Sequence, residues 1–328
     1  MGARLTPGDV ERARVVLAPH RLETPLRESL AVPGVDVRLK LECWQPTGSF
    51  KVRGATHLLS SLSSEERERG VVAASAGNHA LGVAFAASRL GGAVRATLFV
   101  PRTAPRSKVD KLRRFPVEVQ ETGDTYDDAV EAARAFERET GAVYVHAYDD
   151  PRTAAGQGTV GLEVLDDCPE VSTVLVPVGG GGLMAGLATA VKARARDVRV
   201  VAVQPEASPA LRESLRLGRA LLTYPATPTL ADGLSGGIGR IVFEHRDLLD
   251  EVVTVSEEEI EDAMVALLAS DQVVAEASGA VGVAALRAGK VAGAGRGPVV
   301  AVVTGGNVDA RVLKHLLARR FPADGDAR

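Results

Sequence analysis

Short, largely apolar runs alternate along the chain with longer segments of helical period. Residues 71–75 (VVAAS) and 95–100 (RATLFV) predict buried strands, whereas residues 78–90 (NHALGVAFAASRL) repeat apolar positions every three to four residues and predict a helix. The strand–helix pairs expected from this alternation are 37–42 with 50–62, 71–75 with 78–90, 95–100 with 104–114, 117–120 with 124–140, 172–178 with 183–195 and 198–203 with 208–218. Strands separated by crossover helices imply a parallel sheet covered on both faces, so we predict an α/β protein.

Composition and charge exclude several classes of protein. The chain has 328 residues, 45% hydrophobic content and a formal net charge of -3, so it can bury a large core and has no basic surplus for nucleic acid. Its cysteines, Cys43 and Cys168, match no metal-ligand spacing and suit a reducing compartment. The uncharged stretch 171–191 could span a bilayer, but Pro177 and four glycines at its centre indicate a strand, a loop and a helix instead. We therefore predict a globular, cytoplasmic protein that contacts neither nucleic acid nor membrane.

Four consecutive glycines, Gly179 to Gly182, separate one predicted strand from the helix that follows it. Their backbone N–H groups can approach an anion closely, and the positive end of the helix dipole lies beside them, so the run predicts a phosphate site. Two alternatives stay open. Gly180, Gly182 and Ala185 satisfy the dinucleotide fingerprint G-x-G-x-x-A, although that fingerprint normally opens the first strand–helix–strand unit of a chain. The glycines could also form only a tight turn.

A lysine, Lys51, lies between a glycine-bearing turn and a predicted helix in residues 46–55 (PTGSFKVRGA). A lysine near a phosphate cradle suggests pyridoxal 5′-phosphate, whose aldehyde needs an amine and whose phosphate needs several donors. Two further segments, 75–80 (SAGNHA) and 302–309 (VVTGGNVD), each carry a strand end into a glycine-bearing turn. Because ligands gather at the carboxyl ends of parallel strands, we expect all four segments to meet in one crevice.

The four motifs, in this order, resemble those of the fold-type II pyridoxal-phosphate enzymes, and among them the threonine/serine dehydratase and serine racemase group. The resemblance extends from residues 24–29 (TPLRES) to 304–309 (TGGNVD), nearly the whole chain. It implies a tryptophan synthase β-like fold of two parallel-type α/β domains, with the cofactor in the cleft between them. The expected limits are 1–69 and 148–328 for the large cofactor-binding domain and 70–147 for a small inserted domain, with no C-terminal regulatory domain. A homo-oligomer, either a dimer or a tetramer, is also expected.

Carried over position by position, the resemblance assigns roles within the predicted crevice. Lys51 becomes the catalytic residue and Schiff-base lysine, and Asn78 becomes the hydrogen-bond partner of the ring 3′-oxygen. The backbone amides expected to bind the phosphate are those of Gly179, Gly180, Gly181, Gly182 and Leu183. The other cofactor-binding residues are Phe50, Glu276 and Thr304, and the loop for the substrate carboxylate consists of Ser75, Ala76, Gly77, Asn78 and His79. His79 receives no proton-transfer role, and Glu276 is expected either to tune Lys51 or order a water, or to form a surface salt bridge.

The chemistry expected from this resemblance depends on Thr304, whose hydroxyl would face the pyridine nitrogen. Unlike a carboxylate, a hydroxyl cannot stabilise a pyridinium, so the ring is a weaker electron sink and loss of a β leaving group is favoured over transamination. Lys51, neutral in a dry pocket, would remove the Cα proton, and the β-hydroxyl would leave. L-Threonine would then give 2-oxobutyrate and ammonia, and L-serine would give pyruvate and ammonia.

Departures from the pattern of the group bear on the choice among its activities. Ala76 stands where resembling serine racemases have a serine, and a methyl group cannot carry a proton. Gln204 and Ala210 replace carboxylates that bind a divalent metal in those racemases, so no metal site is predicted. Leu81 replaces a glutamine common in the dehydratases. The alternatives are a dehydratase of 3-hydroxyaspartate or phenylserine, then a serine racemase, then a nicotinamide-dependent oxidoreductase. The arginines considered for an acidic substrate are Arg53, Arg152 and Arg240.

Overall fold

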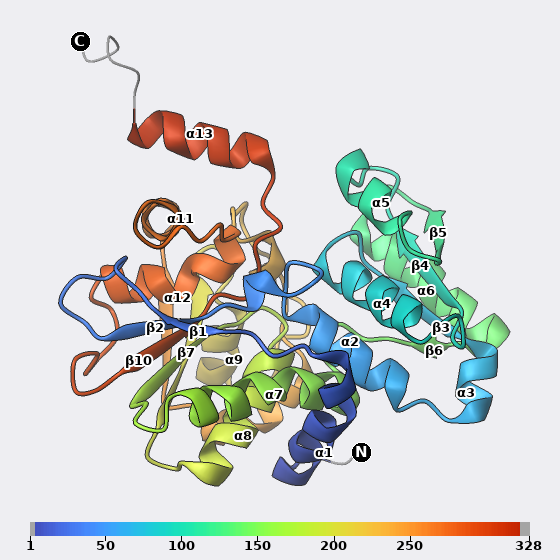
Figure 1. The fold of residues 1–328 in the computed structure, drawn as a ribbon. Coiled ribbons are helices and arrows are strands. Elements are labelled where there is room, and N and C mark those ends of the chain that lie inside the picture. Colours follow the sequence, from blue (N-terminus) through green and yellow to red (C-terminus); the bar gives the residue numbers. More distant parts are fainter. Residues whose placement is uncertain (1–3, 322–328) are drawn as a thin grey trace.

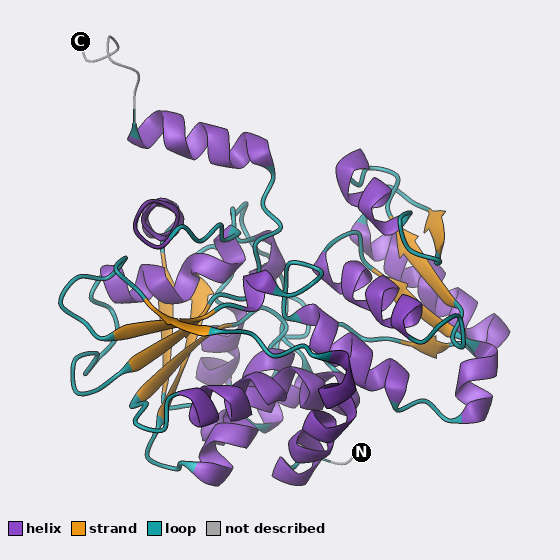
Figure 2. Ribbon diagram, viewed as in Figure 1, coloured by secondary structure: helices purple, strands orange, loops and turns teal. Residues whose placement is uncertain are grey.

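The computed structural model describes residues 4–321, which form two β-sheets with helices packed around each (Figure 1, Figure 2). The larger sheet has the order β1 (Leu26–Glu28), β2 (Val37–Lys40), β10 (Val299–Val302), β7 (Thr173–Pro177), β8 (Arg199–Pro205) and β9 (Glu251–Val255). All its neighbouring strands are parallel except β1 with β2. The smaller sheet, which is parallel throughout, has the order β5 (Glu118–Glu121), β4 (Ala96–Val100), β3 (Val71–Ala74) and β6 (Val143–Tyr144). The predicted α/β class is confirmed.

Helices cover both faces of the larger sheet because successive strand residues point to opposite faces. Leu175 and Val201 pack with α11 (Glu257–Asp271) and α12 (Ala277–Arg287). Their neighbours Val174 and Val200 pack with α7 (Pro151–Asp167) and α8 (Gly182–Arg194), beside α1 (Pro7–Leu17). Figure 1 shows α13 (Ala310–Arg320) standing beyond α11, away from the sheet. The other helices are α2 (Lys51–Ser60), α3 (Ser64–Arg69), α4 (Asn78–Arg89), α5 (Arg106–Leu112), α6 (Tyr126–Thr140), α9 (Ala210–Leu217) and α10 (Arg240–Glu244).

Helix α7 is absent from the predicted strand–helix pairs, and its packing explains why. Every residue from Thr153 to Leu162 is buried, and three glycines, Gly156, Gly158 and Gly161, weaken its local helix signal. It crosses α8 at two glycines, where a Cβ on Gly186 would lie 2.1 Å from the carbonyl oxygen of Ala154 and 2.8 Å from the Cα of Gly158. Close backbone approach, instead of an amphipathic stripe, therefore defines this helix pair.

A buried ionic cluster holds α2, the helix that carries Lys51, against the larger sheet. The guanidinium of Arg53 donates to both carboxylate oxygens of Glu42, at 2.7 and 2.8 Å, and to Glu163 at 2.8 Å. Glu163 also pairs with Lys40 of β2 at 2.7 Å. The side chains of Arg53, Glu42 and Lys40 are at most 2% exposed. The cluster therefore fixes the position of the helix that carries Lys51.

All four strands of the smaller sheet lie between Val71 and Tyr144, inside the segment 70–147 predicted as an inserted domain. The domain limits themselves stay a prediction. The uncharged stretch 171–191 contains β7, a loop and most of α8, as expected. Within residues 4–321, no helix combines the length and apolar character that crossing a membrane requires.

Candidate active site

Lys51 is the first residue of α2, and the turn before it is tied to the turn that follows β10. Ser49 forms an antiparallel bridge with Gly305, and the N–H of Phe50 donates to the carbonyl of Thr304 (3.1 Å). Two segments from opposite ends of the chain therefore set where α2 begins.

The amine of Lys51 points toward the segment that links the two sheets. Its Nζ donates to the carbonyl of Ala147 (2.9 Å) and lies 5.1 Å from the ring centroid of Phe50 and 6.0 Å from that of Tyr148. Burial lowers the pKa of Lys51 to about 8, and the nearby carboxylate of Glu276 opposes this shift. A larger fraction of this amine than of an exposed lysine is therefore neutral, and nucleophilic, near neutral pH.

Asn78 and Glu276 meet across the crevice from different parts of the chain. Asn78 opens α4, and its Nδ2 donates to Oε1 of Glu276 (2.7 Å), while its Oδ1 accepts from Nδ2 of Asn307 (2.8 Å). Glu276 is the N-cap residue of α12. Burial raises the pKa of Glu276 to about 7, with a further contribution from Asp232, whereas the hydrogen bond from Asn78 lowers it. The Glu276 carboxylate is therefore buried next to Asn78, and the alternative of a surface salt bridge is excluded.

The four glycines form the loop between β7 and α8. Gly181 is the N-cap residue and has a φ of +88°, which favours glycine. A side chain on Gly180 would meet the ring of Tyr148 (2.2 Å from Cγ), and one on Gly181 would meet Val242 (2.4 Å from Cγ1). Within residues 4–321, no protein atom accepts a hydrogen bond from the backbone N–H groups of Gly179 to Leu183. These donors are therefore available to an anion.

The loop predicted to bind a carboxylate, residues 75–79, runs from β3 into α4. The hydroxyl of Ser75 accepts from the N–H of Gly77 (3.1 Å), and the first-turn N–H groups of residues 78–80 have no acceptor among the described residues. The His79 ring is buried and turned to the carbonyl of Val145 (2.7 Å). Burial lowers the pKa of His79 to about 3, so the ring stays neutral. Only its backbone can serve a ligand at this loop.

Contacts through Ser278 and Gly233 connect Thr304 to the glycine loop. Its buried hydroxyl donates to the carbonyl of Ser278 (3.4 Å), and the Ser278 hydroxyl accepts from the N–H of Gly233 (3.1 Å). The carbonyl of Gly233 packs against Gly179, where it would be 2.8 Å from an added Cβ. Hydrogen bonds and close contacts thus connect all four predicted segments to one another at the place of the predicted crevice.

Comparison with known proteins identifies the family. A family model described as "Pyridoxal-phosphate dependent enzyme" matches residues 17–305. The chain belongs to this family of pyridoxal-phosphate-dependent enzymes. It is 44% identical over 326 residues to an L-threonine ammonia-lyase of Thermotoga maritima, an alignment covering 98% of this chain and 80% of that protein. The structure of maize serine racemase matches with a TM-score of 0.90, 34% identity and coverage of 97% of this chain and 98% of that chain. The processed form of threonine deaminase isoform 2 from Solanum lycopersicum matches with a TM-score of 0.86, 32% identity and coverage of 94% and 87%.

The predicted fold-type II resemblance is confirmed, and the crevice fits pyridoxal phosphate. It offers one amine with a lowered pKa and a run of unaccepted N–H groups at a helix N-terminus. Gln157 lies beside the glycine loop, and its fully buried Oε1, which has no partner among the described residues, is 2.8 Å from a Cβ placed on Gly182. The dinucleotide interpretation of the glycine loop is set aside, because the family uses a different cofactor.

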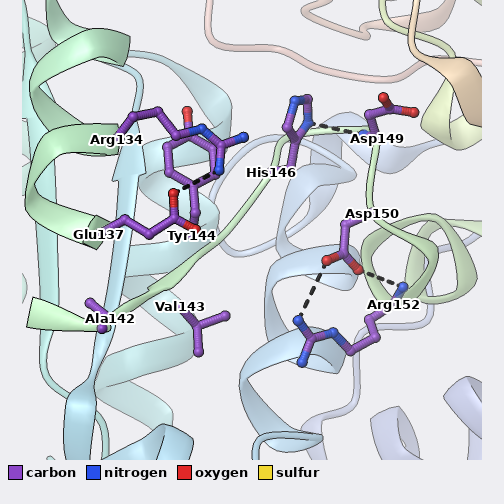
Figure 3. A pocket seen from close by; sticks show the side chains of 10 residues that line it. Arg134, Glu137, Ala142, Val143, Tyr144, His146, Asp149, Asp150 and Arg152 are labelled. Carbon is purple, nitrogen blue, oxygen red and sulfur yellow. Dashed lines mark hydrogen bonds and ion pairs between the residues drawn. The ribbon is translucent and has the colours of Figure 1, made fainter. Parts of the chain in front are cut away.

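Sequence reasoning missed the linking segment 145–150, which places two aromatic rings beside the crevice. The His146 ring packs edge-on against Tyr148 (centroids 4.6 Å apart), and its Nδ1 accepts from the N–H groups of Tyr148 and Asp149 at 3.3 and 3.0 Å. His146 also lines a cavity of about 480 Å³ (Figure 3). Among the charged residues that line this cavity, Arg134 pairs with Glu137 at 2.8 Å and Arg152 with Asp150 at 3.5 Å, while Asp149 accepts from the N–H of Ile241 at 3.0 Å. The aromatic and acidic run YDD before Pro151 was the available signal.

Gln204, at the position of a predicted missing metal ligand, has a structural contact. Its Oε1 accepts from the N–H groups of Leu211 and Arg212 at 3.0 and 3.1 Å, and its Nε2 donates to the carbonyl of Val178 (3.1 Å). The amide therefore joins β8, the start of α9 and the entry to the glycine loop. Among residues 4–321, no group of three or more His, Cys, Asp or Glu side chains could hold a metal ion.

Proposed function

We propose that the protein is a pyridoxal-phosphate-dependent dehydratase, an ammonia-lyase, that converts L-threonine and L-serine to a 2-oxo acid and ammonia. The reaction class is supported by relatives named L-threonine ammonia-lyase and threonine deaminase. The observation that carries the proposal is the Lys51 amine, with a pKa of about 8, in the crevice that the glycine loop also enters. Such an amine can act as a base near neutral pH.

Each group around the crevice would have one task. Pyridoxal phosphate, when bound, would supply an aldehyde for the Lys51 amine and a conjugated ring that withdraws electron density from the substrate Cα. The N–H groups of residues 179–183 would hold its phosphate, and Asn78 would donate to its 3′-oxygen. The first-turn N–H groups of α4 would bind the substrate carboxylate at the positive end of the helix dipole. Lys51, released by the incoming amino acid, would accept the Cα proton at Nζ.

Elimination is favoured over transamination because Thr304 would bring a hydroxyl to the ring nitrogen. If its proton turns from the Ser278 carbonyl to the ring, the hydroxyl donates to a neutral nitrogen without protonating it. Negative charge that develops at Cα is then best relieved by loss of a β substituent. The β-hydroxyl would take up one proton, which balances the proton that Lys51 accepts from Cα, and leave as water, and one water would be taken up when ammonia departs. Each L-threonine would thus yield one 2-oxobutyrate and one ammonia, and each L-serine one pyruvate and one ammonia.

The engaged arginines favour a substrate with an uncharged side chain. Arg53 is held by Glu42 and Glu163, and Arg152 lies 3.5 Å from Asp150. Neither is free to pair with the second carboxylate of 3-hydroxyaspartate. Arg240, the third arginine considered, is exposed at the first position of α10 and has no ion-pair partner within residues 4–321. Arg53 and Arg152 thus support threonine and serine, and the test below includes an acidic substrate.

Serine racemisation is the second candidate because maize serine racemase is a structural neighbour. Racemisation needs a proton carrier on each face of Cα, and Ala76, half-buried against the core of the smaller sheet, has none. We therefore rank racemisation below elimination.

The proposal also covers the location of the protein, its oligomeric state and the movement of its smaller domain. It would reside in the cytoplasm, which the unpaired, buried thiols of Cys43 and Cys168 support. It would form a homo-oligomer, a dimer or tetramer. Residues 70–147 would move as a small domain over the bound substrate and exclude water.

A substrate panel tests the function. The purified protein is assayed for ammonia and 2-oxo acid with L-threonine, L-serine, 3-hydroxyaspartate and phenylserine, and remaining substrate is analysed by chiral chromatography. Lys51→Ala serves as the inactive control. Borohydride reduction followed by peptide mass spectrometry should find the coenzyme on Lys51. Formation of D-serine at rates that rival elimination, or coenzyme attached at another lysine, would contradict the proposal.

A further inference from the structure

A chain of hydrogen bonds that starts at a backbone carbonyl sets the direction of the Asn78 amide. The carbonyl oxygen of Thr47 can only accept, and it receives Nδ2 of Asn307 (2.8 Å). The same Nδ2 donates its second hydrogen to Oδ1 of Asn78 (2.8 Å). Nδ2 of Asn78 is therefore turned away from Asn307, and it donates to Oε1 of Glu276 (2.7 Å).

This series of hydrogen bonds leaves one N–H donor of Asn78 for a ligand. A primary amide has two N–H donors and one oxygen acceptor. Asn307 directs both donors to protein oxygens, whereas Asn78 uses its oxygen and only one donor. Within residues 4–321, the second N–H of Asn78 thus has no protein acceptor. The group that Asn78 offers to the crevice is a donor and not an acceptor.

The turn before Lys51 holds Asn307 in place. Gly48 has a φ of +73°, and a Cβ at this residue would lie 2.9 Å from both Nδ2 and Oδ1 of Asn307. The N–H of Gly306 donates to the Gly48 carbonyl (2.9 Å), which ties the two turns together. Residues 47–51 therefore control both the position of the amine and, through Asn307, the direction of the Asn78 amide.

We propose that Asn307 is a positioning residue that keeps the amide nitrogen of Asn78, and not its oxygen, directed at the 3′-oxygen of pyridoxal phosphate. The inference rests on the proposed function, because it assumes that this coenzyme binds in the crevice. An ionised 3′-oxygen is stabilised by a donor and repelled by an amide oxygen. Asn307 acts together with Glu276, whose Oε1 accepts from Nδ2 of Asn78 (2.7 Å) and favours the same amide direction.

The test compares Asn307→Asp and Asn307→Ala with Asp309→Asn. Aspartate is similar in size but cannot donate to Thr47 or to Oδ1 of Asn78, and its oxygen competes with Glu276 and the 3′-oxygen for Nδ2 of Asn78. Alanine removes the donor without adding charge. Asp309→Asn is the control in the same loop, since asparagine can replace the bond that Asp309 makes to the Arg311 N–H. All four proteins are purified with coenzyme bound to Lys51.

Two measurements report on the 3′-oxygen independently of turnover. The first is the pH dependence of the visible absorption of the bound coenzyme, and the second is its dissociation constant from equilibrium dialysis. A hydrogen bond to a charged group is worth enough that its loss should weaken coenzyme binding by about ten- to a hundredfold in Asn307→Asp. The absorption should shift toward the form with a protonated 3′-oxygen. Asn307→Ala should shift less in the same direction, and Asp309→Asn should match the parent.

The outcomes separate this inference from the proposed function. A parent protein that carries no coenzyme on Lys51 would overturn both. A loaded parent whose absorption and dissociation constant are unchanged in the Asn307 variants would overturn the positioning role alone. A merely structural role would lower the thermal midpoint and leave the pH dependence of the absorption unchanged, which also overturns the inference. If Asn307→Asp does not fold, Asn307→Ala decides between these outcomes.

Discussion

Labelling of lysines at graded pH in the coenzyme-free protein tests the lowered pKa of Lys51. With a pKa of about 8, roughly a tenth of the Lys51 amines are neutral at pH 7, whereas the ordinary value of 10.5 would leave about three in ten thousand neutral. The difference is about 300-fold in reactive amine. Labelling of Lys51 should therefore rise with pH, reach half of its maximum near pH 8 and then level off.

The assay uses trace acetic anhydride, and peptide mass spectrometry quantifies the label on each lysine. Lys314, exposed on α13, is the reference within the same sample. Because the Glu276 carboxylate raises the pKa of Lys51, Glu276→Gln should move the midpoint of Lys51 labelling to a lower pH. Glu258→Gln, which removes the same charge from an exposed position on α11, is the matched control and should leave the midpoint unchanged.

Two results would refute this reasoning. Labelling of Lys51 that keeps rising through pH 10 in parallel with Lys314 would mean that burial does not lower the pKa of its amine. A midpoint that moves upward in Glu276→Gln would mean that the carboxylate does not favour the charged amine. The first result would also remove the argument that Lys51 is a base near neutral pH.

Three further substitutions test the scaffold and the glycine loop. Gly186→Ala places a methyl group 2.1 Å from the carbonyl oxygen of Ala154, so denaturant titration should show the free energy of unfolding reduced by about 1–3 kcal/mol, and an unchanged midpoint would contradict the close crossing. Arg53→Met leaves the buried carboxylate of Glu42 without its counter-charge and should cost about 3–5 kcal/mol in the same titration, while a loss below about 1 kcal/mol would show that the pair adds little. Gly181→Ala strains a residue at φ +88° by about 1–3 kcal/mol; equilibrium dialysis should show weaker coenzyme binding, and unchanged binding would argue against the phosphate role of the loop.

Elements whose signal is local were predicted well. The strand at 71–75 and the helix at 78–90 differ from β3 and α4 by one residue at their ends. Helix α7 was missed, because its three glycines weaken the local helix signal, and at least one of them, Gly158, serves the close crossing with Gly186 of α8. Its assignment depends on a neighbour that the sequence does not place beside it.

The residues of the candidate site also fall into two groups, those that the sequence predicts and those that it does not. Lys51, Asn78 and the four glycines stand in motifs that are recognisable within a few residues, so sequence alone predicts them as site residues. Tyr148 and Asn307 were missed, because each acts through a partner distant in sequence, the ring against Gly180 and the amide between Thr47 and Asn78. The direction of an amide and the contact of a ring depend on long-range packing.

The amino-acid sequence alone was enough to indicate an α/β protein with an anion-binding turn and a reactive amine. Both the conformational freedom of glycine and the hydrophobic period of a segment are properties of residues that are neighbours in the sequence. The tertiary fold decided how these groups act together. It buried the Lys51 amine and so lowered its pKa, brought Glu276 within 2.7 Å of the Asn78 amide, and turned that amide through Asn307. Desolvation and hydrogen-bond direction both depend on groups that only folding brings into contact.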